Sequence, residues 1–294
     1  MAGMERRDRI DAAGVFALVA FALLLGFNQV VIKVSTDGFQ PVFLAGVRSV
    51  GACVAIWIWM QARGISFILP REAWGGALAL GLLFTAEFVF LYLALDRTEV
   101  GRASVIFYSM PVFVALVAHF LIPGERLNLV RAFGLFLAVV GVAWMLLDQS
   151  GSTENLSGDV FALLAAISWA GIAIVVRVTP LERVSPEMQL LSQLVISAVL
   201  LLLASLFFGP FIRALEPIHW AALVFQTLAI ASFGYLFWFF LLKRYPASGV
   251  ASFAFLSPVF GVGLGWLMLG ETVGSEIIGG LVLVALGITL INRR

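Results

Sequence analysis

Long apolar runs separated by short polar breaks extend along the whole chain. A helix needs about 20 mostly apolar residues to cross a bilayer, and ten of the runs approach or reach that length. The breaks between them leave no room for a soluble domain, so the pattern predicts an all-α membrane protein with ten transmembrane helices. The runs lie at roughly 14–34, 41–62, 75–95, 100–121, 130–147, 159–177, 187–208, 218–241, 248–269 and 276–291.

Composition agrees with lipid as the main solvent. Charged residues make up 12% of the chain and hydrophobic residues 62%, whereas a soluble domain carries about 25% charged residues. The single cysteine, Cys53, excludes an intramolecular disulfide and a cysteine zinc cluster. We find no nucleotide-binding, hydrolase or metalloprotease motif. We therefore expect no enzyme, cofactor, metal or nucleic-acid partner; the expected partners are the lipid bilayer and a small-molecule substrate.

Lys and Arg are divided unequally between the two sides of the predicted bundle. Thirteen of the 18 fall in segments on the side of the N-terminus. The opposite loops hold only Lys33, Arg97, Arg102 and Arg213, and Arg48 lies within a span. Basic residues accumulate in cytoplasmic loops. The bias predicts a multi-pass protein of the bacterial inner membrane with both termini in the cytoplasm.

The chain also repeats itself. Ala94–Phe113 resembles Leu241–Phe260, with Pro111 and Pro258 aligned at an offset of 147 residues. Further along the chain the offset becomes 146 residues, and more pairs align: Glu125 with Glu271, Gly134 with Gly280, and Gly141 with Gly287. We divide the chain into a cytoplasmic tail, 1–13, and two five-helix repeats, 14–150 and 151–294.

Five spans per repeat is an odd number, so the second repeat must enter the membrane the opposite way up. Inverted repeats are typical of secondary transporters, whose substrate cavity lies at the interface between the halves. Pro111 and Pro258 occupy equivalent mid-span positions, where proline kinks a helix. We interpret them as paired hinges.

Two charged residues, Arg48 and Glu87, lie clearly within spans, while Asp148, Glu154 and Asp159 are assigned to an acidic outer loop. Arg48 and Glu87 are expected at similar depths in consecutive helices, so we predict that they face each other directly or through water. One interpretation is an ion pair that fixes helix packing. The other is a polar end of the substrate site, or a proton-sensitive carboxylate.

Several polar and aromatic residues are mid-span, where they favour the bundle interior over lipid. A cavity of aromatic and polar side chains suits a flat, partly polar ligand. The repeat mates differ, with Gln193 opposite Arg48 and Gly234 opposite Glu87, so the site is expected to be asymmetric. The candidate substrate-binding residues are Asn28, Gln29, Arg48, Glu87, Tyr92, Tyr108, Trp169, Gln193, Tyr235 and Trp238.

Two local patterns occur once in each repeat. They are Gly124-Glu125 and Gly270-Glu271, and the turns Ser109-Met110-Pro111 and Leu256-Ser257-Pro258. With ten short spans in two halves, they resemble the drug/metabolite transporter superfamily of the EamA type. That resemblance implies a basket-shaped bundle with a central cavity, spans five and ten at its periphery, and export of amino acids or related metabolites.

The segment from Glu87 to Pro111 further resembles aromatic amino-acid exporters of that superfamily. The resemblance implies that Glu87, Tyr108, Met110 and Trp169 line the cavity. Met110 stands where those exporters are expected to carry tryptophan. We expect a secondary transporter that exports aromatic or neutral amino acids and related small metabolites by alternating access. The alternative is an exporter of cationic drugs or other metabolites with Glu87 as the counter-charge, and proton coupling is open in either case.

Overall fold

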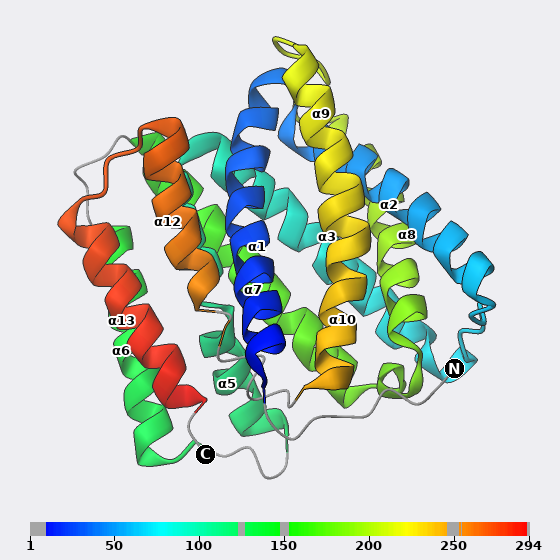
Figure 1. Cartoon of the computed structure of the whole chain (residues 1–294), viewed down its shortest axis with the longest axis horizontal. Coiled ribbons are helices and arrows are strands. Elements are labelled where there is room, and N and C mark those ends of the chain that lie inside the picture. The colour runs from blue at the N-terminus through cyan, green and yellow to red at the C-terminus, as the bar shows by residue number, and fades with distance from the viewer. Residues whose placement is uncertain (1–9, 123–126, 148–152, 246–252, 254, 293–294) are drawn as a thin grey trace.

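The computed structural model describes residues 10–122, 127–147, 153–245, 253 and 255–292, which form a helical bundle (Figure 1). Eight helices or helical stretches are long and apolar enough to span a membrane, and two shorter apolar helices accompany them. The predicted all-α class is confirmed. The residues outside the described ranges include most of the tail 1–13, Gly124-Glu125, Asp148 and the first part of the predicted ninth span.

The helices begin and end within a few residues of the predicted spans, apart from the first, sixth and ninth. Their order is α1 Ala12–Gly38, α2 Pro41–Arg63, η1 Arg71–Ala73, α3 Trp74–Arg97, α4 Val100–Phe107, α5 Met110–Leu121, α6 Leu129–Leu147, α7 Thr153–Val178, η2 Pro180–Arg183, α8 Pro186–Ser205, α9 Pro217–Phe225, η3 Gln226–Gly234, α10 Tyr235–Arg244, α12 Leu256–Leu269 and α13 Ser275–Ile291.

Polar caps mark several of the helix ends. The carboxylate of Asp11 accepts a hydrogen bond from the backbone N–H of Gly14 at 2.8 Å, at the start of α1. Gln40 does the same for Phe43 at the start of α2, also at 2.8 Å. The helix α2 ends at Gly64, whose φ of +62° is a left-handed conformation that glycine adopts without strain. These caps satisfy backbone groups where the chain turns back into the membrane.

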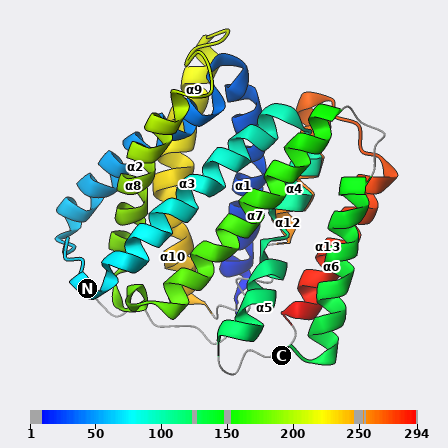
Figure 2. The ribbon, with the colours of Figure 1, turned by 180° about the vertical axis from the view of Figure 1, so that it is seen from behind.

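The two repeats run in opposite directions through the bundle. The helix α1 begins at the face where α13 ends, which we call the termini face, and it runs to the opposite face, which we call the far face (Figure 1). The helix α7, the first of the second repeat, begins at the far face and runs back, as Figure 2 shows from behind. The predicted inverted repeat is confirmed.

The crossing of α6 and α13 supports the repeat independently of hydropathy. A Cβ atom built on Gly134 would lie 2.7 Å from the carbonyl oxygen of Gly287, and one on Gly141 would lie 3.0 Å from that of Gly280. Gly134 and Gly280 are repeat mates, as are Gly141 and Gly287. A two-fold axis requires that mates exchange contacts in this way. Both ribbon views place α6 and α13 at the edge of the bundle, as expected for spans five and ten.

Substitution of Gly287 by valine is expected to force α6 and α13 apart. A side chain there would meet the carbonyl oxygen of Gly134 at 2.5 Å and the Cβ of Ala138 at 2.7 Å. Overpacking of this kind costs about 1–3 kcal/mol, which a thermal unfolding curve in detergent would detect as a lower midpoint. Gly263→Val on α12 is the control, because nothing lies within 4 Å of that position. Equal midpoints for the two variants would contradict the close crossing.

A buried ion pair corrects the sequence-based assignment of two charges to outer loops. Arg102 lies inside α4 and Asp159 inside α7, and they are 5% and 0% exposed. Nε and Nη2 of Arg102 donate to Oδ2 of Asp159 at 2.9 and 2.6 Å. Nη2 also donates to the carbonyl of Met145, and the hydroxyl of Thr98 donates to Asp159 at 2.8 Å. Because α7 begins at Thr153, Asp159 is carried into the bundle, where it joins the two halves.

Candidate substrate cavity

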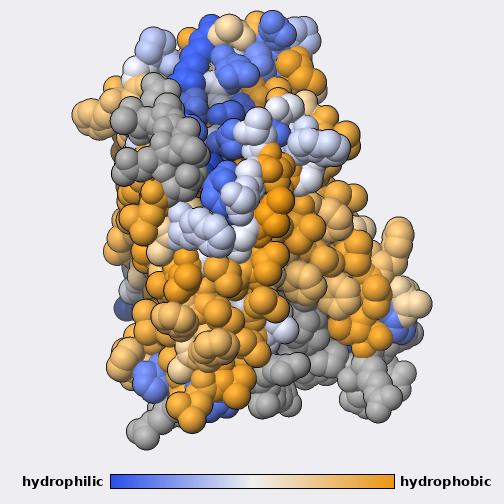
Figure 3. Space-filling model, turned by 90° about the vertical axis from the view of Figure 1, so that its left-hand side faces the viewer, coloured by the Kyte–Doolittle hydropathy of each residue, from blue (hydrophilic) through white to orange (hydrophobic). Residues whose placement is uncertain are grey.

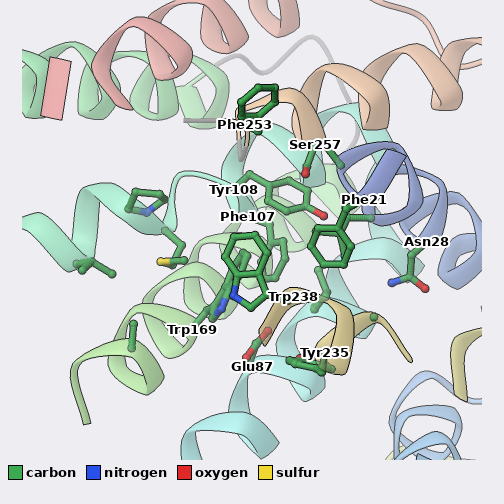
Figure 4. Close-up of a pocket in the computed structure, with 18 of the residues that line it drawn as sticks. Phe21, Asn28, Glu87, Phe107, Tyr108, Trp169, Tyr235, Trp238, Phe253 and Ser257 are labelled. Atoms are coloured by element: carbon green, nitrogen blue, oxygen red, sulfur yellow. The ribbon is translucent and has the colours of Figure 1, made fainter. Parts of the chain in front are cut away.

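A cavity of about 660 Å³ lies between the two repeats. Its walls come from elements of both repeats, namely α1, α2, α3, the α4–α5 break, α7, η3, α10 and α12 (Figure 4). Leu127, Arg131, Arg177 and Asn292 line its outer part, and all four stand at helix ends of the termini face. The cavity therefore extends from the termini face into the middle of the bundle.

Nine of the eleven predicted site residues line this cavity. They are Asn28, Gln29, Arg48, Glu87, Tyr108, Met110, Trp169, Tyr235 and Trp238. The structure does not place Tyr92 and Gln193 among the lining residues. Tyr92 is fully buried behind the wall, where its hydroxyl donates to Gln226. Gln193 belongs to α8, which packs on α2 and α3 and contributes no lining residue, because the cavity opens asymmetrically with respect to the repeat axis.

Pro111 also lines the cavity, and it follows a break in the helix. The helix α4 ends at Phe107, Tyr108 and Ser109 form a turn, and Pro111 is the second residue of α5. Proline is well suited to this position because its missing N–H would have no partner in the first turn. Pro258 is the third residue of α12. The chain is thus broken rather than only kinked before Pro111, and the role of both prolines as hinges stays a prediction.

Arg48 and Glu87 both lie at this cavity, but they do not contact each other. The guanidinium carbon of Arg48 is 3.8 Å from the ring centroid of Phe88 and 5.5 Å from that of Tyr92. Within the described part of the chain, Nε, Nη1 and Nη2 of Arg48 have no hydrogen-bond acceptor, and no salt bridge joins Arg48 to Glu87. The residues are 0% and 3% exposed. Of the two predicted arrangements, direct pairing is therefore wrong.

Burial of the Arg48 guanidinium without a hydrogen-bond acceptor has a large free-energy cost. Burial of an ion costs several kcal/mol after relaxation, and a desolvated cation–π contact returns about 2 kcal/mol. The rings of Phe88 and Tyr92 thus compensate only part of the cost of burying Arg48. This end of the cavity is polar and electrostatically unsatisfied.

Aromatic rings form much of the remaining wall (Figure 4). Trp169 stacks on Phe107 with ring centroids 4.9 Å apart and meets Tyr108 edge-on at 5.9 Å. On the other side Trp238 stacks on Phe21 at 5.5 Å. Phe21 and Phe107 were not among the predicted site residues. Hydropathy gives no signal for them, since a phenylalanine facing lipid and one facing a cavity look alike in sequence.

A π-helix, η3, supports the cavity from the second repeat. Its residues Ile230 and Gly234 line the cavity, while Gln226 at its start donates to the hydroxyl of Ser35 at 2.8 Å. π-helices are rare and often occur at functional sites. Gly234 is the repeat mate of Glu87, so the same position supplies a carboxyl group in one half and no side chain in the other. No pattern in the sequence indicated this segment.

Comparison with known proteins identifies the family. A model of the EamA-like transporter family matches residues 12–147 and again residues 156–293. The chain belongs to this family. It is 26% identical over 286 residues to the uncharacterized transporter YoaV of Bacillus subtilis, covering 93% of this chain and 94% of that protein. It is 28% identical over 300 residues to a probable amino-acid metabolite efflux pump of Salmonella typhimurium, covering 97% and 94%.

A solved crystal structure shares the fold of this EamA-like transporter. The TM-score is 0.67 at 21% identity, over 96% of this chain and 98% of the other. The double family match agrees with the two repeats. It also agrees with the expectation that the chain is not an enzyme, because the family consists of transporters.

Glu271 ties the two halves of this EamA-like transporter together at the far face. Its carboxylate accepts hydrogen bonds from the backbone N–H groups of Val100 at 2.6 Å and Gly101 at 3.0 Å, at the N-terminus of α4. Lys33 donates to the carbonyl of Thr98 nearby at 3.0 Å. Polar surface gathers at this end, above an apolar flank (Figure 3). The Gly270-Glu271 pattern therefore caps a helix of the opposite repeat at the far face.

Glu99 lies just before α4, near the carboxylate of Glu271. Burial raises the pKa of Glu99, and the neighbouring charge of Glu271 raises it further. The positive charge of Arg102 opposes this rise, while Glu276 and Asp159 add smaller upward effects. A carboxyl group whose pKa is raised by folding contributes stability at low pH that is lost as pH rises through the folded-state pKa.

Glu99→Gln is therefore expected to raise the unfolding midpoint at pH 7, because it removes a charge that folding disfavours. The gain should vanish near pH 4, around the pKa of an unperturbed glutamate of about 4.3. Midpoints measured between pH 4 and 8 test this, with the exposed Glu72→Gln as the control. A constant difference across the range would contradict the assignment.

Proposed function

We propose that this secondary transporter exports aromatic or neutral amino acids and related small metabolites by alternating access. The supporting observation is a cavity between inverted halves that opens at the termini face, ends at a buried arginine and a buried carboxyl group, and is walled by aromatic rings. The cavity is of the size range of small-molecule sites. The similarity to the Salmonella protein named a probable amino-acid metabolite efflux pump is consistent with this substrate class.

The direction of transport follows from the predicted orientation. The excess of Lys and Arg supports an orientation in which the termini face lies in the cytoplasm of a bacterial inner membrane. The cavity would then load from the cytoplasm, as an exporter requires. Repacking of the two halves would close the termini face and open the far face.

Proteoliposomes loaded with each of the twenty radiolabelled amino acids test the proposal. We expect efflux of phenylalanine, tyrosine, tryptophan and some aliphatic amino acids, above that of protein-free liposomes. Efflux of none of the twenty would contradict the proposal.

Glu87 favours a second candidate, export of organic cations. The carboxyl group lies at the cavity and forms no hydrogen bond or salt bridge with the described residues, so it is available as a counter-charge when ionised. Under this alternative, wild-type protein would move tetraphenylphosphonium and Glu87→Gln would not.

Under the amino-acid proposal, Glu87→Gln instead reduces phenylalanine flux at low concentration by about tenfold. A charge-assisted hydrogen bond contributes about 1.5–3 kcal/mol, and 1.4 kcal/mol corresponds to a factor of ten. Tetraphenylphosphonium flux should be absent even from the wild type. Both fluxes are measured beside the Glu72→Gln control, and phenylalanine flux that survives unchanged in Glu87→Gln would remove Glu87 from the site.

A further inference from the structure

The guanidinium of Arg48 is the least satisfied polar group at the cavity. Its three nitrogens are covered and find no acceptor among the residues that the structure describes. Buried polar atoms in native proteins are nearly always hydrogen-bonded, and a buried charge with no partner is especially unfavourable. The ring faces of Phe88 and Tyr92 lie against the cation, and the hydroxyl of Tyr92 donates its hydrogen to Gln226. The site is therefore matched to an anionic acceptor that comes from outside the chain.

Acceptors without donors line the same cavity. Oδ1 of Asn28 and Oε1 of Gln29 are buried and have no hydrogen-bond partner in the described part of the chain. The carboxyl group of Glu87 lines the same cavity and adds two more oxygens. One wall thus offers N–H donors to an anion, while three side-chain groups offer oxygens to a cation.

We infer that Arg48 binds the carboxylate of the transported substrate, so that the substrate is an amino acid held by both of its charged groups. The guanidinium presents paired N–H groups that match the two oxygens of a carboxylate. The ammonium group then meets Glu87 and the free oxygens of Asn28 and Gln29, and the side chain lies against Trp169 and its neighbours. This inference rests on the proposed function and deepens it, since a purely cationic ligand would leave Arg48 unsatisfied.

Access to Arg48 requires a local movement. The arginine is 0% exposed and the Phe88 ring, itself 5% exposed, covers it. The ring must turn aside, or the arginine must extend, before an anion can reach the nitrogens. Binding of substrate is thus coupled to rearrangement of α3 side chains at the closed end of the cavity.

Three ligands of one shape test the inference on the unaltered protein. They are L-phenylalanine, L-phenylalaninamide, which lacks the carboxylate, and 3-phenylpropanoate, which lacks the ammonium group. Dissociation constants are measured by calorimetry on the full chain in nanodiscs. We expect the amide to bind at least about tenfold more weakly than phenylalanine, because it loses a charge-assisted interaction. Equal affinities of amide and amino acid would overturn the inference.

Arg48→Met then assigns the effect to the arginine. The variant should bind phenylalanine about tenfold or more weakly and should no longer distinguish it from the amide. Arg48→Lys keeps the charge without the planar fork and is expected to be intermediate. Arg63→Met, at the exposed end of the same helix, is the matched control and should behave as the wild type. Full discrimination in Arg48→Met would overturn the inference.

The same ligands separate this inference from the proposed function. If no amino acid is transported but 3-phenylpropanoate binds in an Arg48-dependent way, the carboxylate site stands and the amino-acid function fails. If amino acids are transported and the amide binds equally well, the function stands and the role of Arg48 fails. If no carboxylate binds, both fail.

Discussion

Asp159→Ala is expected to destabilise the protein by about 3–5 kcal/mol, the usual cost of removing one member of a buried ion pair. The substitution would remove the carboxylate to which two nitrogens of Arg102, a residue only 5% exposed, donate. It would also remove the acceptor of the Thr98 hydroxyl. Thermal unfolding and the yield of monodisperse protein in detergent measure the effect.

A double variant tests the physical reason. Arg102→Met combined with Asp159→Leu removes both charges and leaves apolar side chains, an exchange that is often neutral or stabilising. It should recover most of the midpoint lost in Asp159→Ala. If the double variant is as unstable as the single one, the loss does not come from an uncompensated charge.

Ala173→Trp is expected to reduce transport to background while leaving the fold intact. Ala173 lines the cavity between Trp169 and Arg177, so an indole there would occupy the path between the mouth and the charged end. The open space should accept the side chain without loss of thermal stability. Flux of labelled phenylalanine in proteoliposomes measures the effect.

Ile167→Trp is the matched control, on the same helix α7 but 44% exposed on the outer surface. It introduces the same side chain and should leave flux unchanged. Equal flux in Ala173→Trp and Ile167→Trp would mean that substrate does not pass through this cavity.

Much of the fold was predictable from the sequence because lipid imposes a simple rule. Each crossing needs a helix of fixed length, so hydropathy located the spans, and the odd number per repeat required inversion. The glycines that the sequence aligned between the repeats lie at the contact of α6 with α13, where only small residues allow two backbones so close. Nine of the eleven proposed site residues line the cavity for a related reason, namely that polar side chains avoid lipid.

The features that the sequence analysis missed depend on distances between side chains, which the order of hydrophobic and polar residues along the chain does not contain. Arg102 and Asp159 looked like loop charges because each lies near the end of an apolar run, and only their 2.6 Å contact shows that they are paired. Gln193 was proposed by symmetry with Arg48, but the cavity opens on one face and so breaks that symmetry. The π-helix η3 has no distinctive amino-acid composition, so the sequence pattern did not reveal it.

The most direct test of the central claim is counterflow in proteoliposomes. Vesicles containing the protein and a high concentration of unlabelled phenylalanine are diluted into a trace of labelled phenylalanine. A carrier whose cavity opens alternately to each face exchanges one for the other, so the label should accumulate transiently above its equilibrium level and then decline. Label that rises steadily to equilibrium, at a rate independent of the internal phenylalanine, would contradict alternating access through this cavity.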